Sequence, residues 1–249
     1  MWTRAQLKSN AKAVLGQSYW KAFVVGLVLL FVSGGGTGGV SGSGSSSGSG
    51  TFSGNDAFLS DGILAWLIPL VIGGILVAGV IGIALSIMVF SPLEVGCRRF
   101  YLESTQNRFE LRELGYAFTN KGYVNIVLTM LLRGVYTVLW FLCFIIPGIV
   151  KSYSYSMVPY ILSENPMIAP SRAIEISKQM TRGHKLDMLV LDISFFGWIL
   201  LGGLALGVGI LFVNPYIHST HAQLYLALRA NALELGITSL YELTPPERY

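Results

Sequence analysis

Eight polar or ionisable side chains stand within, or at the ends of, long apolar stretches of this 249-residue sequence. Charged and hydrogen-bonding groups at membrane depth are costly unless they find partners, and they commonly serve a substrate, ion or proton pathway. The eight groups therefore form the candidate intramembrane polar network of this chain: Glu94, Arg133, Tyr153, Tyr155, Asp192, Asn214, His218 and His221.

Arg133 is the most informative of these groups, because it interrupts the apolar run 124–146. A buried cation is tolerated when a carboxylate pairs with it. Glu94 and Asp192 lie toward the cytoplasmic half of the protein in the topology described below, as Arg133 does. The sequence therefore predicts an ion pair between Arg133 and either Glu94 or Asp192. A role in substrate or ion binding is the alternative for Arg133.

Motifs for metal, nucleotide or redox chemistry are missing from the sequence. His218 and His221 are three residues apart and can share one helix face, but no HExxH pattern supplies further zinc ligands. No P-loop is present, and Cys97 and Cys143 do not form a CxxC pair. We expect two free thiols, no metal, no cofactor and no enzymatic activity.

The elements that carry these groups are apolar enough to lie in a lipid bilayer. Ile63–Phe90 contains 28 residues without a charged side chain, whereas a bilayer core of ~30 Å needs roughly 20 apolar residues as a helix. Hydrophobic residues make up 53% of the chain and charged residues 12%, against about 25% charged in soluble domains. The net charge of +4 comes from basic residues at the ends of apolar runs, which indicates membrane topology rather than nucleic-acid binding.

The positive-inside rule gives one consistent topology for a single integral membrane domain, 1–249, with both termini in the cytoplasm. We predict an all-α, polytopic helical membrane protein. Its cytoplasmic parts are the loops 91–123 and 163–187 and a soluble tail, 231–249. A flexible Gly/Ser-rich loop, 33–62, lies outside, as do turns at Pro147-Gly148 and Asn214-Pro215. The six expected transmembrane helices are 22–32, 63–90, 124–146, 149–162, 188–213 and 216–230.

Amphipathic and glycine-containing stretches suggest how these helices are anchored and packed. Residues 1–21 form either a basic amphipathic helix on an anionic membrane surface or a leader helix packed on the protein. A second amphipathic helix, 169–180, is expected on the membrane surface, and a short helix within 109–118. Two rows of small residues predict close helix packing in the bundle: Gly74, Ala78 and Gly82, and Gly203 and Gly207.

Four blocks of this sequence carry a family resemblance: SPLEVGCRRFYL at 91–102, IIPGIVKSYSYSMVPYILSENP at 145–166, RGHKLDMLVLDISFFGWILL at 182–201 and NPYIHSTHAQLY at 214–225. Together they resemble one family of bacterial integral membrane proteins, domain of unknown function 975 (DUF975). The resemblance implies a multi-span protein of the bacterial cell membrane. It brings no assigned reaction with it, and the Gly/Ser-rich loop departs from the family pattern.

Two functions are compatible with these features. The first is a non-enzymatic membrane component that assists a partner complex in export or envelope maintenance, in contact with the anionic cytoplasmic leaflet and a membrane protein partner. The alternative is a transporter of a small solute or peptide, with a polar cavity lined by the hydroxyl-rich segment 149–162 and by 215–230. A water-accessible cavity between those segments favours the transporter, and a packed interior favours the partner.

Overall fold

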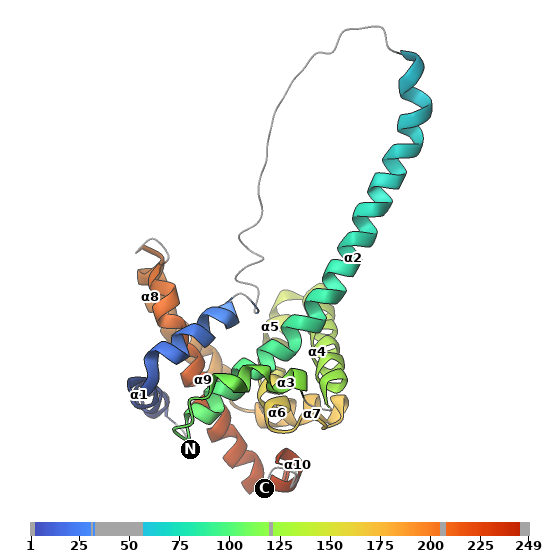
Figure 1. Ribbon diagram of the computed structural model, residues 1–249. Coiled ribbons are helices and arrows are strands. Elements are labelled where there is room, and N and C mark those ends of the chain that lie inside the picture. The colour runs from blue at the N-terminus through green and yellow to red at the C-terminus, as the bar shows by residue number, and fades with distance from the viewer. Residues whose placement is uncertain (1–2, 31, 33–56, 120–121, 205–207, 245–249) are drawn as a thin grey trace.

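The computed structural model describes residues 3–30, 32, 57–119, 122–204 and 208–244. This part of the chain is helical and contains no strand, as the sequence predicts (Figure 1). The α-helices are α1 Arg4–Leu30, α2 Ala57–Ser104, α3 Tyr116–Thr119, α4 Tyr123–Cys143, α5 Ile145–Ser154, α6 Val158–Glu164, α7 Pro170–Met180, α8 Lys185–Leu204, α9 Val208–Glu234 and α10 Leu240–Leu243; a 3-10 helix, η2, covers Leu111–Gly115.

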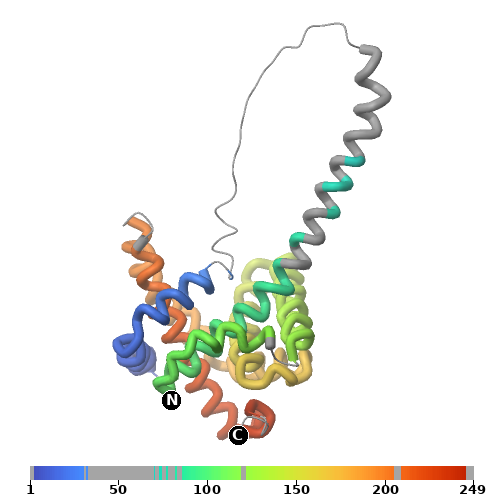
Figure 2. The backbone as a smooth tube through the Cα atoms, in the orientation of Figure 1, coloured from blue at the N-terminus to red at the C-terminus, as the bar shows by residue number. Residues whose placement is uncertain are grey.

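The helices form two groups that meet around the C-terminal half of α2. Helix α1 packs along α9, which also packs against α8, while α4 pairs with α5. Figure 2 shows these groups on either side of α2, with α6 and α7 at the end of the molecule near the C-terminus. Among the residues that the structure describes, three helices are long and apolar enough to cross a membrane by length and composition: α1, α4 and α8.

Helix α1 is one element rather than a surface helix followed by a span over 22–32. Its backbone leaves helical geometry at Ser18, where φ is −154° and ψ is 54°, so that the helix is kinked there. Leu7, Ala11 and Leu15 are buried, which selects the packed leader helix of the two alternatives. A single kinked helix forms because its N-terminal apolar face finds protein contacts.

Helix α2 runs through two boundaries predicted from the sequence. Residues 57–62, assigned to the outside loop, are helical, while 33–56 lie outside the described residues. Residues 91–104, assigned to a cytoplasmic loop, continue the same helix and supply Val95, Phe100 and Tyr101 to the core. The prediction was wrong because the basic residues Arg98 and Arg99 indicated a cytoplasmic loop, although both side chains are paired within the protein.

The small-residue row in α2 does not lie inside the bundle. A Cβ atom added to Gly74 or Gly82 would meet nothing within 4 Å, and Leu70 and Val77 are exposed. Figure 1 shows this half of α2 extending beyond the other helices. The row therefore has no partner among the described residues.

The turn predicted at Pro147-Gly148 lies slightly earlier in the chain. Helix α4 ends at Cys143, Phe144 is extended, and Pro147 falls in the first turn of α5, where proline is tolerated. The return segment 149–162 is not one spanning helix, since it divides between α5 and α6. The 10 residues of α5 rise only ~15 Å, about half the ~30 Å bilayer core.

The next predicted turn, at Asn214-Pro215, is also misplaced. Pro215 lies inside α9, and α8 already ends at Leu204. Gly202 and Gly209 make the close α8–α9 contact, since a Cβ on either would lie within 3 Å of the other's backbone. Nothing lies within 4 Å of a Cβ added to Gly203, and Gly207 is outside the described residues. Proline was read as a helix end, but membrane helices accommodate it when neighbours satisfy the freed backbone groups.

The predicted cytoplasmic helices exist, but they pack on the protein. Helix α7 matches the expected 169–180, and η2 with α3 matches the short helix within 109–118. The apolar side of α7 is buried through Ala173, Ile174 and Ile176, so its expected place on the membrane surface is not supported. The tail is not simply solvated either, because α9 continues to Glu234 and α10 docks through the buried Leu243.

Candidate polar cavity

A polar cavity of about 380 Å³ lies where α2, α4, α5, α6, α8 and α9 meet. Segment 149–162 contributes five of its lining residues and α9 contributes one, so both predicted segments reach it. The lining residues are Arg98, Arg133, Phe141, Ile149, Ser152, Tyr153, Ser156, Tyr160, Met188, Asp192 and His221.

One wall of the cavity is cationic. Glu94 and Arg98 are four residues apart on α2, so that both project from the same helix face. Arg133 reaches this face from α4, and the Nη atoms of Arg98 and Arg133 each lie 3.6 Å from Oε1 of Glu94. Two guanidinium groups thus share one carboxylate, which leaves this wall with one positive charge in excess.

Arg98 is the centre of this wall. Its Nη1 donates to the hydroxyl of Tyr160 at 3.2 Å and lies 3.0 Å from Nδ1 of His218. Since a guanidinium can only donate, Nδ1 of His218 must accept, and the imidazole is neutral in this contact. The buried Nε–H of Arg98 has no hydrogen-bond partner among the described residues.

The opposite wall is built around Asp192 on α8. The hydroxyl of Tyr153 donates to its Oδ2 at 2.8 Å, and Nε2 of His221 lies 2.9 Å from its Oδ1. These side chains come from α5 and α9, so three separate helices must meet to complete the wall. The Asp192 side chain keeps 35% of its surface exposed and can accept a further hydrogen bond from a solute or water.

Of the two carboxylates predicted as alternatives for Arg133, the structure pairs it with Glu94. Asp192 is held by Tyr153 and His221 instead. Spacing along the chain cannot separate the two possibilities, because each requires contact between residues at least 39 positions apart.

The structure brings six of the eight predicted polar residues together around this cavity, with Glu94 and His218 behind its cationic wall. Tyr155 is buried away from it, with its ring 6.4 Å from that of Tyr136. The side chain of Asn214 donates to the carbonyl oxygen of Gly26 at 2.9 Å and joins α9 to α1. Both therefore have structural contacts elsewhere.

Sequence reasoning missed Arg98, which makes more polar contacts than any other lining residue. Its spacing of four from Glu94 was a usable signal, but the basic residue had been counted as a mark of a cytoplasmic loop. Ser152, Ser156 and Tyr160 belong to the hydroxyl-rich segment 149–162 that the sequence predicts as a cavity lining, and the structure places all three at the cavity.

The histidines do not converge on a common point, because His218 meets Arg98 whereas His221 meets Asp192. Within the described residues no group of three or more His, Cys, Asp or Glu side chains is placed to hold a metal ion. Cys97 is buried, Cys143 is exposed, and both are free.

A second hollow, of about 550 Å³, lies near the end of the protein formed by α6 and α10. Its charges are matched within the protein: Arg99 pairs with Glu113, and Arg229 lies 3.0 Å from Glu164. Each cation here faces its own carboxylate, which is the arrangement of a structural ion-pair cluster. In the cavity at Arg98 and Asp192, by contrast, two arginines share one carboxylate, and Asp192 has no arginine partner.

Residues 141–232 match the family described as Protein of unknown function (DUF975). The match contains three of the four sequence blocks that carry the resemblance and leaves 91–102 outside. It therefore includes the Asp192 wall but not Arg98 or Arg133. Comparison with curated proteins and with solved structures finds no match.

Proposed function

We propose that this chain, which matches the family described as Protein of unknown function (DUF975) over residues 141–232, is a membrane transporter of a small polar solute. The observation that carries the proposal is the cavity between the arginine wall and Asp192. A packed interior would instead favour the partner-assisting role.

The lining suits a solute that exchanges hydrogen bonds with the protein. Arg98 and Arg133 offer hydrogen-bond donors on one side of the cavity, and Asp192 offers an acceptor on the other. Ser152 and Ser156 of the hydroxyl-rich segment 149–162 also line the cavity. The broken α5–α6 segment supports the same reading, because irregular backbone at membrane depth is favourable only where protein or a water-filled cavity surrounds it. The proposal includes no catalytic step.

The membrane placement that accompanies this function has six crossings, counting α5–α6 as one broken crossing, in the bacterial cell membrane. Helices α1, α4 and α8 support three crossings by length and composition, and the charge-free stretch Ile63–Phe90 supports a fourth through α2. Helix α9 supplies the remaining one. Both termini are then cytoplasmic, near the anionic lipid headgroups of that leaflet.

Cysteine accessibility tests whether water reaches the cavity. In a Cys97→Ser, Cys143→Ser background, Ser152→Cys should react with a charged, membrane-impermeant thiol reagent, because Ser152 lines the cavity. Leu200→Cys is the matched control, since Leu200 is 57% exposed on α8 but lies outside the cavity lining. Equal reaction at both positions, or none at either, would contradict a water-accessible cavity.

Uptake by proteoliposomes tests transport itself. Vesicles with the purified protein are incubated with a mixture of small metabolites, and their contents are measured by mass spectrometry. Asp192→Asn should lower uptake of the transported solute at least about tenfold, since a hydrogen bond to a charged group contributes ~1.5–3 kcal/mol. Glu234→Gln, which neutralises an exposed carboxylate of α9, should leave uptake unchanged. If no solute enters above the level of empty vesicles, the transport proposal is wrong.

A partner-assisting component is the second candidate, and the N-terminal half of α2 favours it. Val77 is 60% exposed, and Gly74 and Gly82 leave room for another helix to approach. A photocrosslinking amino acid at Val77 should yield an adduct with one membrane protein in native membranes. The same probe at Val138 of α4, which is 66% exposed, should yield none. Equal crosslinking at the two sites would indicate random contact.

A further inference from the structure

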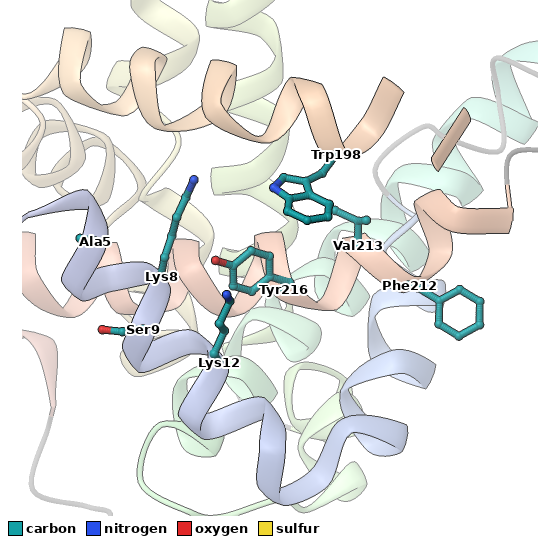
Figure 3. Close-up of a pocket in the computed structure, with 8 residues that line it drawn as sticks. All are labelled: Ala5, Lys8, Ser9, Lys12, Trp198, Phe212, Val213 and Tyr216. Atoms are coloured by element: carbon teal, nitrogen blue, oxygen red, sulfur yellow. The ribbon is translucent and has the colours of Figure 1, made fainter. Parts of the chain in front are cut away.

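A groove separate from the polar cavity opens between α1, α8 and α9. Its volume is about 480 Å³, and most of its lining is apolar or aromatic. Figure 3 shows Trp198 of α8 and Val213 and Tyr216 of α9 on one side and Lys8 and Lys12 of α1 on the other, with the ring of Phe212 at the far end, directed away from the lysines. We call this site the lysine groove.

The two lysines present their ammonium groups to the same space. They are four residues apart, so they share one face of α1, and Figure 3 shows both extending toward α8 and α9 with the hydroxyl end of Tyr216 directed between them. Nζ of Lys8 lies 2.7 Å from Oγ of Ser194, and Nζ of Lys12 lies 5.9 Å from the centre of the Tyr216 ring. Nζ of Lys8 also lies 4.5 Å from the centre of the Phe195 ring. An ammonium group has three N–H donors, so the bond to Ser194 leaves Lys8 able to donate to a further acceptor.

The charge of the lysine groove is not balanced by the protein. Across the described parts of the chain, no carboxylate lies within 4.0 Å of Lys8 or Lys12. This distinguishes the groove from the polar cavity and the α6–α10 hollow, where the arginines contact Glu94, Glu113 or Glu164. Two neighbouring cations without an acid are complementary to a phosphate group.

The rest of the groove is complementary to hydrocarbon. Trp198 is 58% exposed and Phe212 is 47% exposed, although both are large apolar side chains. Tryptophan and tyrosine rings are typical of positions where headgroups meet acyl chains. The phosphate side and the hydrocarbon side of the lysine groove therefore adjoin, as they do in one phospholipid molecule.

We propose that the lysine groove binds an anionic phospholipid. Lys8 and Lys12 hold its phosphate, and an acyl chain lies over Trp198 and Phe212. The proposal does not depend on transport, because none of the groove residues lines the polar cavity. The sequence predicts contact with an anionic leaflet in general, whereas the lysine groove is one specific binding site. In this proposal the N-terminal part of α1 contacts a lipid as well as the other helices.

Native mass spectrometry of the detergent-purified full chain provides the test, with phosphatidylglycerol as the anionic probe and phosphatidylcholine as the zwitterionic one. The wild type should bind one phosphatidylglycerol molecule in preference to phosphatidylcholine. Removing both lysines by Lys8→Gln with Lys12→Gln should weaken phosphatidylglycerol binding at least about tenfold, since each basic residue near an anionic surface contributes ~1 kcal/mol.

Matched variants separate a specific site from a general charge effect. Lys178→Gln with Lys185→Gln removes the same charge from residues outside the lysine groove and should leave phosphatidylglycerol binding unchanged. Lys8→Arg with Lys12→Arg keeps the charge and should keep the binding, which also controls for folding of α1. Trp198→Ala should lower the affinity for phosphatidylglycerol and should not raise the affinity for phosphatidylcholine.

Three results would overturn the proposal. They are equal binding of the two lipids by the wild type, full phosphatidylglycerol binding by the Lys8→Gln, Lys12→Gln variant, and equal weakening by the Lys178→Gln, Lys185→Gln control. Competition with inorganic phosphate distinguishes a lipid phosphate from a free phosphate ion as the ligand of the lysine groove. If phosphate displaces phosphatidylglycerol from the wild type at equal concentration, the groove recognises the free anion and not the lipid.

Discussion

The two halves of α2 differ in polarity and in packing, and the more polar half is the better packed. The half that ends near Phe90 is free of charge from Ile63 onward, yet Leu70, Val77 and Val89 are exposed. The half from Ser91 to Ser104 carries four charged residues, yet Val95, Cys97, Phe100 and Tyr101 are buried. Hydrophobicity therefore does not identify the core of this helix.

The physical reason follows from the proposed membrane location, because the surroundings of a membrane protein are themselves apolar. Lipid chains are as apolar as leucine, so contact with lipid and contact with another helix differ little for such a side chain. A guanidinium or carboxylate has no comparable alternative at membrane depth and must find partners within the protein. Glu94, Arg98 and Arg99 consequently draw α4, α6 and η2 toward one half of α2.

The largest expected effect tests whether polar contacts stabilise the packed half. Glu94→Gln should lower the free energy of unfolding by about 3 kcal/mol, because it leaves two partly buried arginines without their shared carboxylate. The measurement is denaturant unfolding in detergent. Glu110→Gln, on an exposed residue outside these contacts, should change stability by less than about 0.5 kcal/mol. Equal effects of the two variants would mean that the α2 ion pairs contribute nothing specific.

An intermediate effect compares two glycines of α2 directly. A Cβ on Gly96 would lie 2.3 Å from the carbonyl oxygen of Leu114, whereas a Cβ on Gly82 would meet nothing within 4 Å. Gly96→Ala should therefore destabilise the protein by about 2 kcal/mol through overpacking. Gly82→Ala should be neutral or slightly stabilising, since alanine is the better helix former by ~1 kcal/mol.

Thermal unfolding of the two glycine variants under identical detergent conditions measures this difference. If Gly82→Ala were as damaging as Gly96→Ala, the N-terminal half of α2 would have a packing partner in the isolated chain. The conclusion that only the half from Ser91 to Ser104 is packed within the protein would then be wrong. If Gly82→Ala were neutral in detergent but reduced crosslinking from Val77 in membranes, the partner-assisting role would gain support.

The smallest expected effect concerns a charge pair between the short helices α7 and α10. Nε of Arg172 on α7 lies 2.7 Å from Oε1 of Glu242 on α10, and this hydrogen bond lowers the pKa of Glu242 from its ordinary value of 4.5. Because the pKa is lower in the folded state, the pair stabilises the fold above pH ~4.5 and loses that effect as the pH falls through the lowered pKa.

Glu242→Gln should therefore reduce stability by at most ~1 kcal/mol at pH 7, since both side chains are partly exposed. The difference from the wild type should shrink as the pH falls below ~4. Thermal unfolding across this pH range provides the measurement. A difference that stays constant with pH would show that the pair docks α10 through geometry alone.

The sequence anticipated a good part of the polar cavity, and its misses share one cause. The sequence predicts a carboxylate partner for Arg133 and a cavity-lining role for the hydroxyl-rich segment 149–162, because polar side chains in apolar runs require partners. The turns were misplaced because Pro147 and Pro215 were read as helix ends, whereas one lies in a first turn and the other within α9. Local patterns cannot show whether neighbouring helices compensate for a proline.

By itself the sequence determined the helical class of this protein, its apolar stretches and the polar groups that must not face lipid, because these depend on side-chain chemistry and spacing along the chain. Only the tertiary structure decided that Arg98 stands opposite Asp192, that 91–104 belongs to the core and that Lys8 faces Trp198. Those outcomes depend on the kinks, register and rotation of helices far apart in sequence, and no local pattern specifies them.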